Sequence, residues 1–126
     1  MTAVLDSSAI LAFMWQEKGH EVVATYLADG CVSTVNLAEV YAKCQERGVD
    51  MDTARALLAS FQLTIVNYDE QQAFITGGLR AQTVRAGLSM GDRACLSLAM
   101  VRGAVAVTAD GAWRSLALSV QVVSIR

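Results

Sequence analysis

Four acidic residues lie far apart in the sequence but at similar places in the pattern of predicted elements: Asp6, Glu39, Asp92 and Asp110. Asp6 directly follows the apolar run 3–5, and Asp110 comes soon after the apolar run 105–108. Glu39 and Asp92 stand in the first turns of predicted helices. Ligands of open α/β sheets bind at the carboxyl ends of the strands. The sequence therefore predicts four carboxylates gathered around one point.

The expected orientation of Asp92 indicates what such a group could do. Asp92 lies three and four positions before Cys95 and Leu96, on an apolar stripe, so its side chain should face the sheet. A buried carboxylate without a partner is costly, and close carboxylates raise one another's pKa. A divalent cation removes both problems, and carboxylate oxygens favour Mg²⁺ or Mn²⁺, while the single histidine, His20, gives little support for zinc. The predicted chemistry is metal-assisted hydrolysis of a phosphate ester, with one ion or two.

Each acid also has a purely structural interpretation. Asp6 and Asp110 could be N-caps of the helices that follow them. Glu39 and Asp92 each lie three residues after an asparagine or a serine, which is the spacing of a capping box. Glu39 could also pair with Lys43 on an exposed helix face. The pattern alone leaves these alternatives open.

Short apolar runs alternate with helical patterns along the chain, which is typical of a parallel sheet covered by helices. The predicted strands occupy residues 3–5, 31–33, 63–66, 105–108 and 120–125. The predicted helices occupy residues 9–16, 20–29, 36–48, 52–61, 70–86, 89–103 and 111–116. The predicted fold class is therefore α/β.

The composition limits the possible classes of protein. The 126 residues, 54% of them hydrophobic, suit one domain with a substantial core. Ten Lys and Arg against twelve Asp and Glu give a net charge of −2, which is not the basic footprint of most nucleic-acid binders. Three cysteines without paired spacing are expected to be reduced core residues. Neither a signal peptide nor a membrane-spanning run of about 20 apolar residues is apparent, so a cytoplasmic location is expected.

Four short segments together resemble a known family, the PIN-domain ribonucleases of the VapC toxin type. The segments are LDSSA at 5–9, VNLAEV at 35–40, LSMGDRACL at 88–96 and TADGAW at 108–113. Each motif is weak by itself. Their combination is specific, because all four occur in order and the resemblance extends over essentially the entire chain.

The resemblance implies a single PIN domain over residues 1–126, with a five-stranded, mainly parallel sheet flanked by helices on both faces. It also implies a Mg²⁺- or Mn²⁺-dependent endoribonuclease that forms a homodimer and is restrained by a VapB-type antitoxin. By the same resemblance, Asp6 and Asp92 would be the principal metal ligands, and Glu39 and Asp110 would complete the acidic pocket. Thr108 would be a polar support beside them.

Two further features predict contacts with other molecules. Arg93 follows Asp92, and Arg80 and Arg85 lie on the preceding predicted helix, so these arginines could guide RNA. Ordinary surface charge is the alternative for each of them. The apolar segment 13–15 could form part of a partner-binding surface, in keeping with the resemblance, or could simply pack into the core.

Two other functional classes compete with the ribonuclease. One is a catalytically inactive PIN-like module that only binds partners, which the presence of all four acids disfavours. The other is a phosphatase or phospho-receiver domain, which shares the doubly wound layout and an acidic pocket. Asp6 is followed by two serines rather than by the second acid of a D-x-D motif, and no lysine follows Lys43 to hold a phosphoryl group. This second class is therefore disfavoured.

Overall fold

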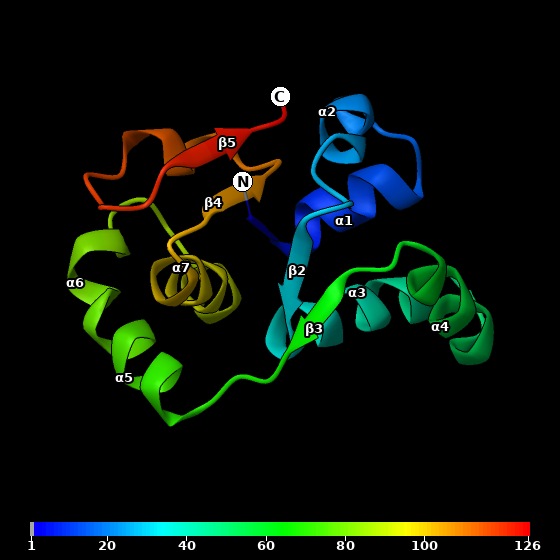
Figure 1. Cartoon of the computed structure of the whole chain (residues 1–126), viewed down its shortest axis with the longest axis horizontal. Coiled ribbons are helices and arrows are strands. Elements are labelled where there is room, and N and C mark those ends of the chain that lie inside the picture. Colours follow the sequence, from blue (N-terminus) through cyan, green and yellow to red (C-terminus); the bar gives the residue numbers. More distant parts are fainter. Residues whose placement is uncertain (1) are drawn as a thin grey trace.

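A computed structural model describes residues 2–126 as one parallel sheet with helices around it (Figure 1). The strands, in the spatial order β3-β2-β1-β4-β5, are β1 (Ala3–Leu5), β2 (Gly30–Ser33), β3 (Thr64–Val66), β4 (Val105–Thr108) and β5 (Val122–Ser124). Every pair of neighbouring strands is parallel. The chain moves outward from β1 to β3 and then crosses to the other side of β1. The order reverses beside β1, which is where open α/β sheets bind ligands.

The helices follow the strands in alternation, as predicted. They are α1 (Ser7–Met14), α2 (His20–Ala24), α3 (Thr34–Glu46), α4 (Met51–Ser60), α5 (Glu70–Gly78), α6 (Arg80–Thr83), α7 (Met90–Arg102) and the 3₁₀ helix η1 (Gly111–Ser115). The α/β class and the five-stranded sheet are confirmed. None of the helices within residues 2–126 has both the length and the apolar character needed to cross a bilayer.

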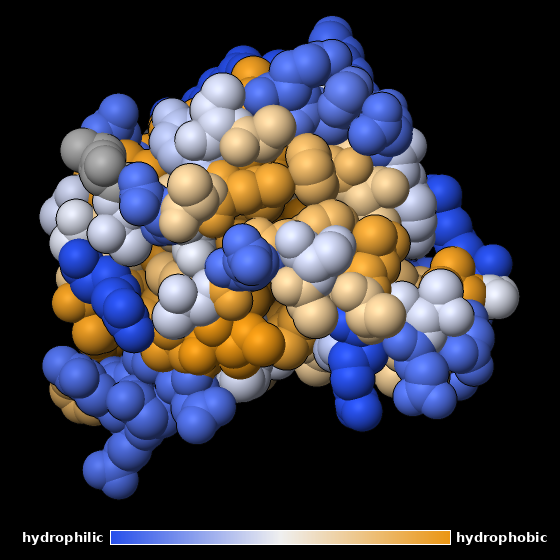
Figure 2. Space-filling view, turned by 45° about the vertical axis from the view of Figure 1, so that its right-hand side comes forward, coloured by the Kyte–Doolittle hydropathy of each residue, from blue (hydrophilic) through white to orange (hydrophobic). Residues whose placement is uncertain are grey.

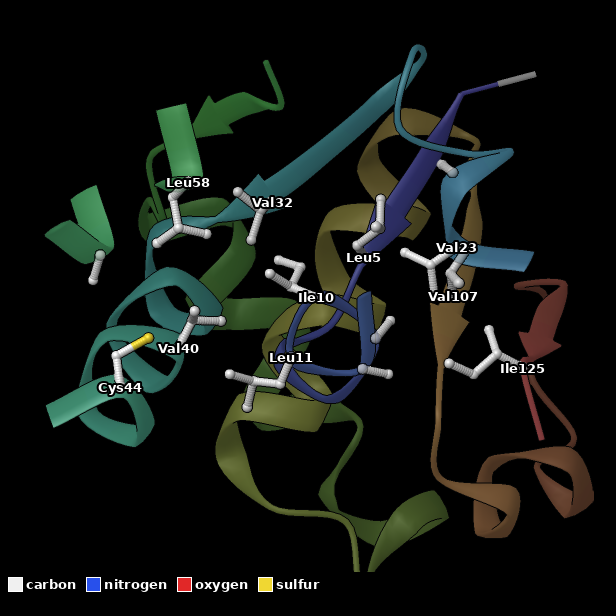
Figure 3. Packing of buried hydrophobic residues seen from close by; sticks show 14 of the residues in the cluster. Leu5, Ile10, Leu11, Val23, Val32, Val40, Cys44, Leu58, Val107 and Ile125 are labelled. Carbon is white, nitrogen blue, oxygen red and sulfur yellow. The ribbon is translucent and has the colours of Figure 1, made fainter. Parts of the chain in front are cut away.

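Successive residues of β1 point to opposite faces of the sheet and enter two separate cores. Leu5 belongs to a cluster formed with buried side chains of α1, α2, α3 and α4, which Figure 3 shows from close by. Val4 belongs to a second cluster that includes Leu96 of α7 and Trp113 of η1. Helices therefore cover both faces of the sheet, and β1 is held between them. This burial fixes the strand whose carboxyl end leads to Asp6.

The segment 13–15 packs mainly into the first core. The ring of Phe13 meets that of Phe61 edge to face, with the centroids 5.0 Å apart. The sulfur of Met14 lies 3.6 Å from that of Cys44. These contacts support the core-packing alternative for Phe13 and Met14. All three cysteines are free and buried, as predicted.

Some large apolar side chains remain at the surface. Phe74 on α5 is 84% exposed, and Ile65 on the edge strand β3 is 57% exposed. Figure 2 shows a face whose middle is largely apolar and whose rim is hydrophilic.

Two of the predicted helices are shorter than the sequence pattern indicates. The predicted helix 70–86 is divided into α5 and α6, because Gly77 and Gly78 weaken its middle and the Thr83 hydroxyl donates to the Leu79 carbonyl. The predicted helix 20–29 ends at Ala24, where the Thr25 hydroxyl donates a hydrogen bond to the Val22 carbonyl. The last strand is likewise limited to 122–124.

The predicted start of α3 is wrong by two residues, and this changes the role of Asn36. The N-cap is Ser33, whose hydroxyl accepts a hydrogen bond from the Val35 N–H. Asn36 therefore lies inside the helix and does not form a capping box with Glu39. The second predicted capping box, which Ser89 and Asp92 form at the start of α7, is present.

Candidate metal centre

Asp6 stands at the carboxyl end of β1 and forms the N-cap of α1, with 2% of its surface exposed. Its Oδ1 accepts hydrogen bonds from the Ser8 hydroxyl at 2.6 Å and from the Ala9 N–H at 3.0 Å. Its Oδ2 accepts from the Thr108 hydroxyl at 2.9 Å. Because Thr108 is the last residue of β4, this bond joins the carboxyl ends of the two strands. The Asp6 carboxylate is thus held at the reversal of the strand order.

The same hydroxyls also hold the segment that carries Asp110. The Ala109 N–H donates to the Ser8 Oγ at 2.9 Å, and the Asp110 N–H donates to the Thr108 Oγ1 at 3.0 Å. Asp110 is exposed and caps η1, because its Oδ1 accepts from the Ala112 N–H at 2.9 Å. Asp110 therefore has a capping role and also lies at the edge where Asp6 is buried.

Glu39 reaches this edge from α3, where two neighbours restrict its carboxylate. The side-chain amide of Asn36, which is 1% exposed, donates to Glu39 Oε1 at 2.9 Å and to the Gly91 carbonyl at 3.0 Å. A Cβ atom at Gly91 would lie 2.3 Å from Glu39 Oε2. Asn36 thereby ties α3 to the first turn of α7, and the missing side chain at Gly91 leaves room for the Glu39 carboxylate.

Asp92 is the residue after Gly91 and is half-buried. Its Oδ2 accepts a hydrogen bond from the Ser89 N–H at 2.9 Å, and its own N–H donates to the Ser89 hydroxyl at 3.2 Å. This capping box orients the carboxylate at the start of α7. The stripe that continues through Cys95 and Leu96 is buried, as its spacing predicts.

Burial and neighbouring charges act on two of the acids, Asp6 and Asp92. Burial raises the pKa of Asp6 from 3.8 to about 6, against the lowering effect of its hydrogen bonds, and the charge of Asp92 adds to the rise. Burial also raises the pKa of Asp92, with smaller contributions from the charges of Asp110 and Glu39. The charges of Glu39 and Asp110 thus act on Asp92, and the charge of Asp92 acts on Asp6.

The donor set fits a hard divalent cation in its chemistry. None of the ion pairs among residues 2–126 involves the four acids. A buried carboxylate without a cationic partner, surrounded by further carboxylates, is the environment that Mg²⁺ or Mn²⁺ stabilises. In the described conformation, however, no three Asp, Glu, His or Cys side chains enclose a metal position. The Asp92 and Asp110 carboxylates accept hydrogen bonds at the starts of α7 and η1, and the Glu39 carboxylate lies between Asn36 and Gly91.

The three arginines predicted to guide RNA lie in different surroundings. The Arg93 Nη1 donates to the Thr76 carbonyl at 2.9 Å, which directs its side chain to α5. Arg80 and Arg85 are exposed in or just after α6. Within the described chain, no hydrogen bond or ion pair links these arginines to the four acids.

Three residues of the site were missed by the sequence analysis: Ser8, Asn36 and Gly91. Ser8 reads as a helix-start residue and Asn36 as a cap, so neither spacing indicates a contact with a distant element. Gly91 offered a signal, because a glycine in the first turn of a helix often marks a close approach of another group.

The chain is thus an α/β domain with Asp6 at the carboxyl end of β1 and Asp110 just after β4, the two central neighbouring strands. The family model of the PIN domain matches residues 3–118, so the chain belongs to the PIN-domain family. A comparison with curated proteins finds no significant match.

Solved structures with the same fold come from several bacteria. The DNA-bound VapBC complex of Salmonella typhimurium contains a chain with a TM-score of 0.75 and 22% identity, and the match covers 100% of this chain and 99% of that one. VapBC2 of Rickettsia felis, bound to a promoter DNA fragment, contains a chain with a TM-score of 0.75 and 16% identity, and the match covers 98% of each chain. VapC20 of Mycobacterium tuberculosis is a toxin that cleaves the sarcin-ricin loop. Its TM-score is 0.72 and its identity 14%, and the match covers 95% of this chain and 99% of VapC20.

The close contact at Gly91 leads to a prediction for Gly91→Ala. The new methyl group would force the Glu39 carboxylate to move, because it would lie 2.3 Å from Oε2. We expect Mg²⁺ affinity to fall on the order of tenfold, corresponding to about 1.4 kcal/mol, with the fold retained. Calorimetric titration with Mg²⁺ measures the affinity. Gly78→Ala is the matched control, because Gly78 lies in α5 and its Cβ would meet nothing within 4 Å. An unchanged affinity in Gly91→Ala would mean that the position of Glu39 does not matter for metal binding.

Proposed function

We propose that the protein is a metal-dependent endoribonuclease and the toxin of a type II toxin–antitoxin pair. The observation that carries this proposal is the Asp6 carboxylate, which is buried at the carboxyl end of β1 and forms no ion pair with any side chain of residues 2–126. Membership of the PIN-domain family supports the same conclusion. So does the fold shared with VapC20, a toxin that cleaves the sarcin-ricin loop.

Asp6, Glu39, Asp92 and Asp110 would hold one or two Mg²⁺ or Mn²⁺ ions. Bound there, such an ion supplies a nucleophilic water and neutralises charge at a phosphodiester that is hydrolysed in line. The chain itself supplies the positions of the ligands. Ser8 and Thr108 orient the two oxygens of Asp6, and the strand ends that carry them are packed between two helical layers.

The proposal includes a protein partner. The fold matches chains of VapBC complexes from Salmonella typhimurium and Rickettsia felis, which supports a VapB-type antitoxin for this chain too. Exposed apolar side chains such as Phe74 support a homodimer or another protein contact. We place the activity in the cytoplasm, where RNA and a co-expressed antitoxin would both be present.

Cleavage of end-labelled RNA by the purified, antitoxin-free protein tests the activity. Pools of transfer, ribosomal and messenger RNA are incubated with Mg²⁺ or Mn²⁺, with EDTA, and with EDTA followed by excess Mn²⁺. Cutting that EDTA stops and Mn²⁺ restores is the expected result. Folded protein that cuts none of the pools under any condition would contradict the proposal and favour a module that only binds partners.

Asn36→Ala tests whether the acidic pocket depends on the Asn36 amide. Loss of its bond to Glu39 should lower Mg²⁺ affinity by roughly tenfold, in line with about 1–1.5 kcal/mol for a hydrogen bond. The effect should disappear in a Glu39→Gln background, because Asn36 acts through the Glu39 carboxylate. Calorimetric titration of the two single variants and the double variant measures this coupling. Equal losses in both backgrounds would assign Asn36 a general structural role instead.

A further inference from the structure

A cleft of about 340 Å³ opens beside the acidic centre, between α1 and the carboxyl-terminal part of α3. Its walls include Ser8, Leu11, Trp15, Lys43, Arg47 and Arg126. We propose that this cleft binds the single-stranded RNA that leads away from the acidic centre. This inference rests on the proposed function, because it assigns a path to that substrate.

Two elements connect the lining of the cleft to the acidic centre, the start of α1 and the helix α3. Ser8 forms part of the cleft wall, and its hydroxyl donates to the Asp6 carboxylate. Glu39 and Lys43 are spaced four residues apart on one face of α3, and Arg47, the C-cap residue of α3, comes four residues further. Arg47 lies about 12 Å along the helix from Glu39, since each residue advances the helix by 1.5 Å. We infer that an RNA strand held at the acids would pass Ser8 and enter the cleft.

The charges in the cleft suit phosphate groups. Three cations line it, against two carboxylates, Glu17 and Glu46. Arg126 lies 3.2 Å and Arg47 4.0 Å from Glu17, and Lys43 lies 3.2 Å from Glu46. All of these side chains are at least 40% exposed, and such surface ion pairs contribute only about 0–1 kcal/mol. The cations can thus exchange these partners for phosphate oxygens at little cost.

The Arg47 side chain also provides a surface for a base. Its guanidinium lies over the ring of Trp15, 3.6 Å from the ring centroid, and the side chain is 56% exposed. A flat guanidinium supported by an indole offers its outer face for stacking, which is how proteins commonly hold unpaired RNA bases. Leu11 and Trp15 are the apolar members of the lining, so the cleft suits a polyanion better than an apolar peptide segment.

The test uses a fluorescent single-stranded RNA of mixed sequence and the full chain with Asp92→Asn, which prevents cutting during the measurement. The Kd is measured in Mg²⁺ at several salt concentrations for this protein and for two double variants of it. Lys43→Ala with Arg47→Ala removes two cleft cations. Arg55→Ala with Arg102→Ala removes the same charge from exposed positions on α4 and α7 and is the matched control.

The cleft variant should bind RNA on the order of tenfold more weakly, and its salt dependence should decrease by about 1.4 in the slope of log K against log salt. The control should retain its affinity. RNA should also quench tryptophan fluorescence through Trp15, because Trp113 is fully buried, so Trp15→Phe should lose the quenching. Equal losses in both double variants would mean unspecific charge attraction and would overturn the inference. Unchanged RNA affinity in the cleft variant would also overturn the inference. This holds whether or not the cleft variant loses a co-expressed protein partner.

Failure of this inference is distinguishable from failure of the proposed function. Wild-type protein that cuts RNA with metal while the cleft variant binds normally would refute the cleft alone. Protein that cuts no RNA but binds it through the cleft would refute the ribonuclease and retain the binding surface.

Discussion

Asp92→Asn is expected to reduce metal-dependent RNA cleavage by about 1,000-fold or more. The substitution keeps the size of the side chain, and the new carbonyl can still accept from the Ser89 N–H. It removes one negative charge from the proposed ligand set. A loss of roughly 4 kcal/mol of transition-state stabilisation corresponds to this rate, at about 1.36 kcal/mol for each factor of ten. Initial rates on end-labelled RNA measure the effect.

The matched control for Asp92→Asn is Asp69→Asn. Asp69 also caps a helix, because its Oδ1 accepts from the Gln72 N–H at 2.9 Å, but it precedes α5 outside the acidic centre. Both variants should keep their circular dichroism spectra and most of their stability. If Asp69→Asn lost as much activity as Asp92→Asn, helix capping rather than the carboxylate centre would explain the loss.

Asp6→Asn is expected to stabilise the metal-free protein at neutral pH and to abolish its stabilisation by Mg²⁺. The folded-state pKa of Asp6 is about 6, above the ordinary value of 3.8, so the folded protein binds this proton more tightly than the unfolded chain does. The contribution of this proton to the free energy of unfolding is complete below about pH 4 and is lost as the pH rises through 6. At pH 7.5 the ionised Asp6 therefore costs the metal-free fold roughly 2–3 kcal/mol, which asparagine should largely recover.

Denaturant unfolding of wild type and Asp6→Asn between pH 4 and pH 8 measures this difference. The stabilising effect of the substitution should be close to zero near pH 4 and largest above pH 7. Adding Mg²⁺ should stabilise the wild type in proportion to the logarithm of its concentration and leave the variant unchanged. A variant that is less stable than the metal-free wild type at pH 7.5 would contradict the view that Asp6 is an unneutralised buried charge.

The strands and the general place of the acids could be predicted from the sequence, because they depend on local patterns. The apolar runs before Asp6 and Asp110 identify β1 and β4, and a parallel sheet brings their carboxyl ends together. The buried stripe on α7 predicts the orientation of Asp92. These features need no knowledge of contacts between distant residues.

The supports of the site could not be predicted in the same way. Asn36 contacts Gly91, 55 residues away, and this contact depends on how α3 packs against α7. Its spacing from Glu39 equally suits a capping box, and only the start of α3 at Thr34 excludes one. The position of Arg47 over Trp15 likewise depends on the packing of α1 against α3. Tertiary packing therefore determines the contacts of Asn36 and Arg47, for which the local sequence pattern allows more than one structure.

The proposed mechanism requires a divalent cation bound by Asp6, Glu39, Asp92 and Asp110, and a titration with Mn²⁺ followed by electron paramagnetic resonance tests this most directly. The wild type should show saturable binding of one or two ions that Mg²⁺ displaces. Each of the four amide substitutions, Asp to Asn or Glu to Gln, should weaken that binding, while Asp69→Asn should not. Mn²⁺ binding that is absent from the wild type, or that remains unchanged in Asp6→Asn and Asp92→Asn, would contradict the proposed metal centre.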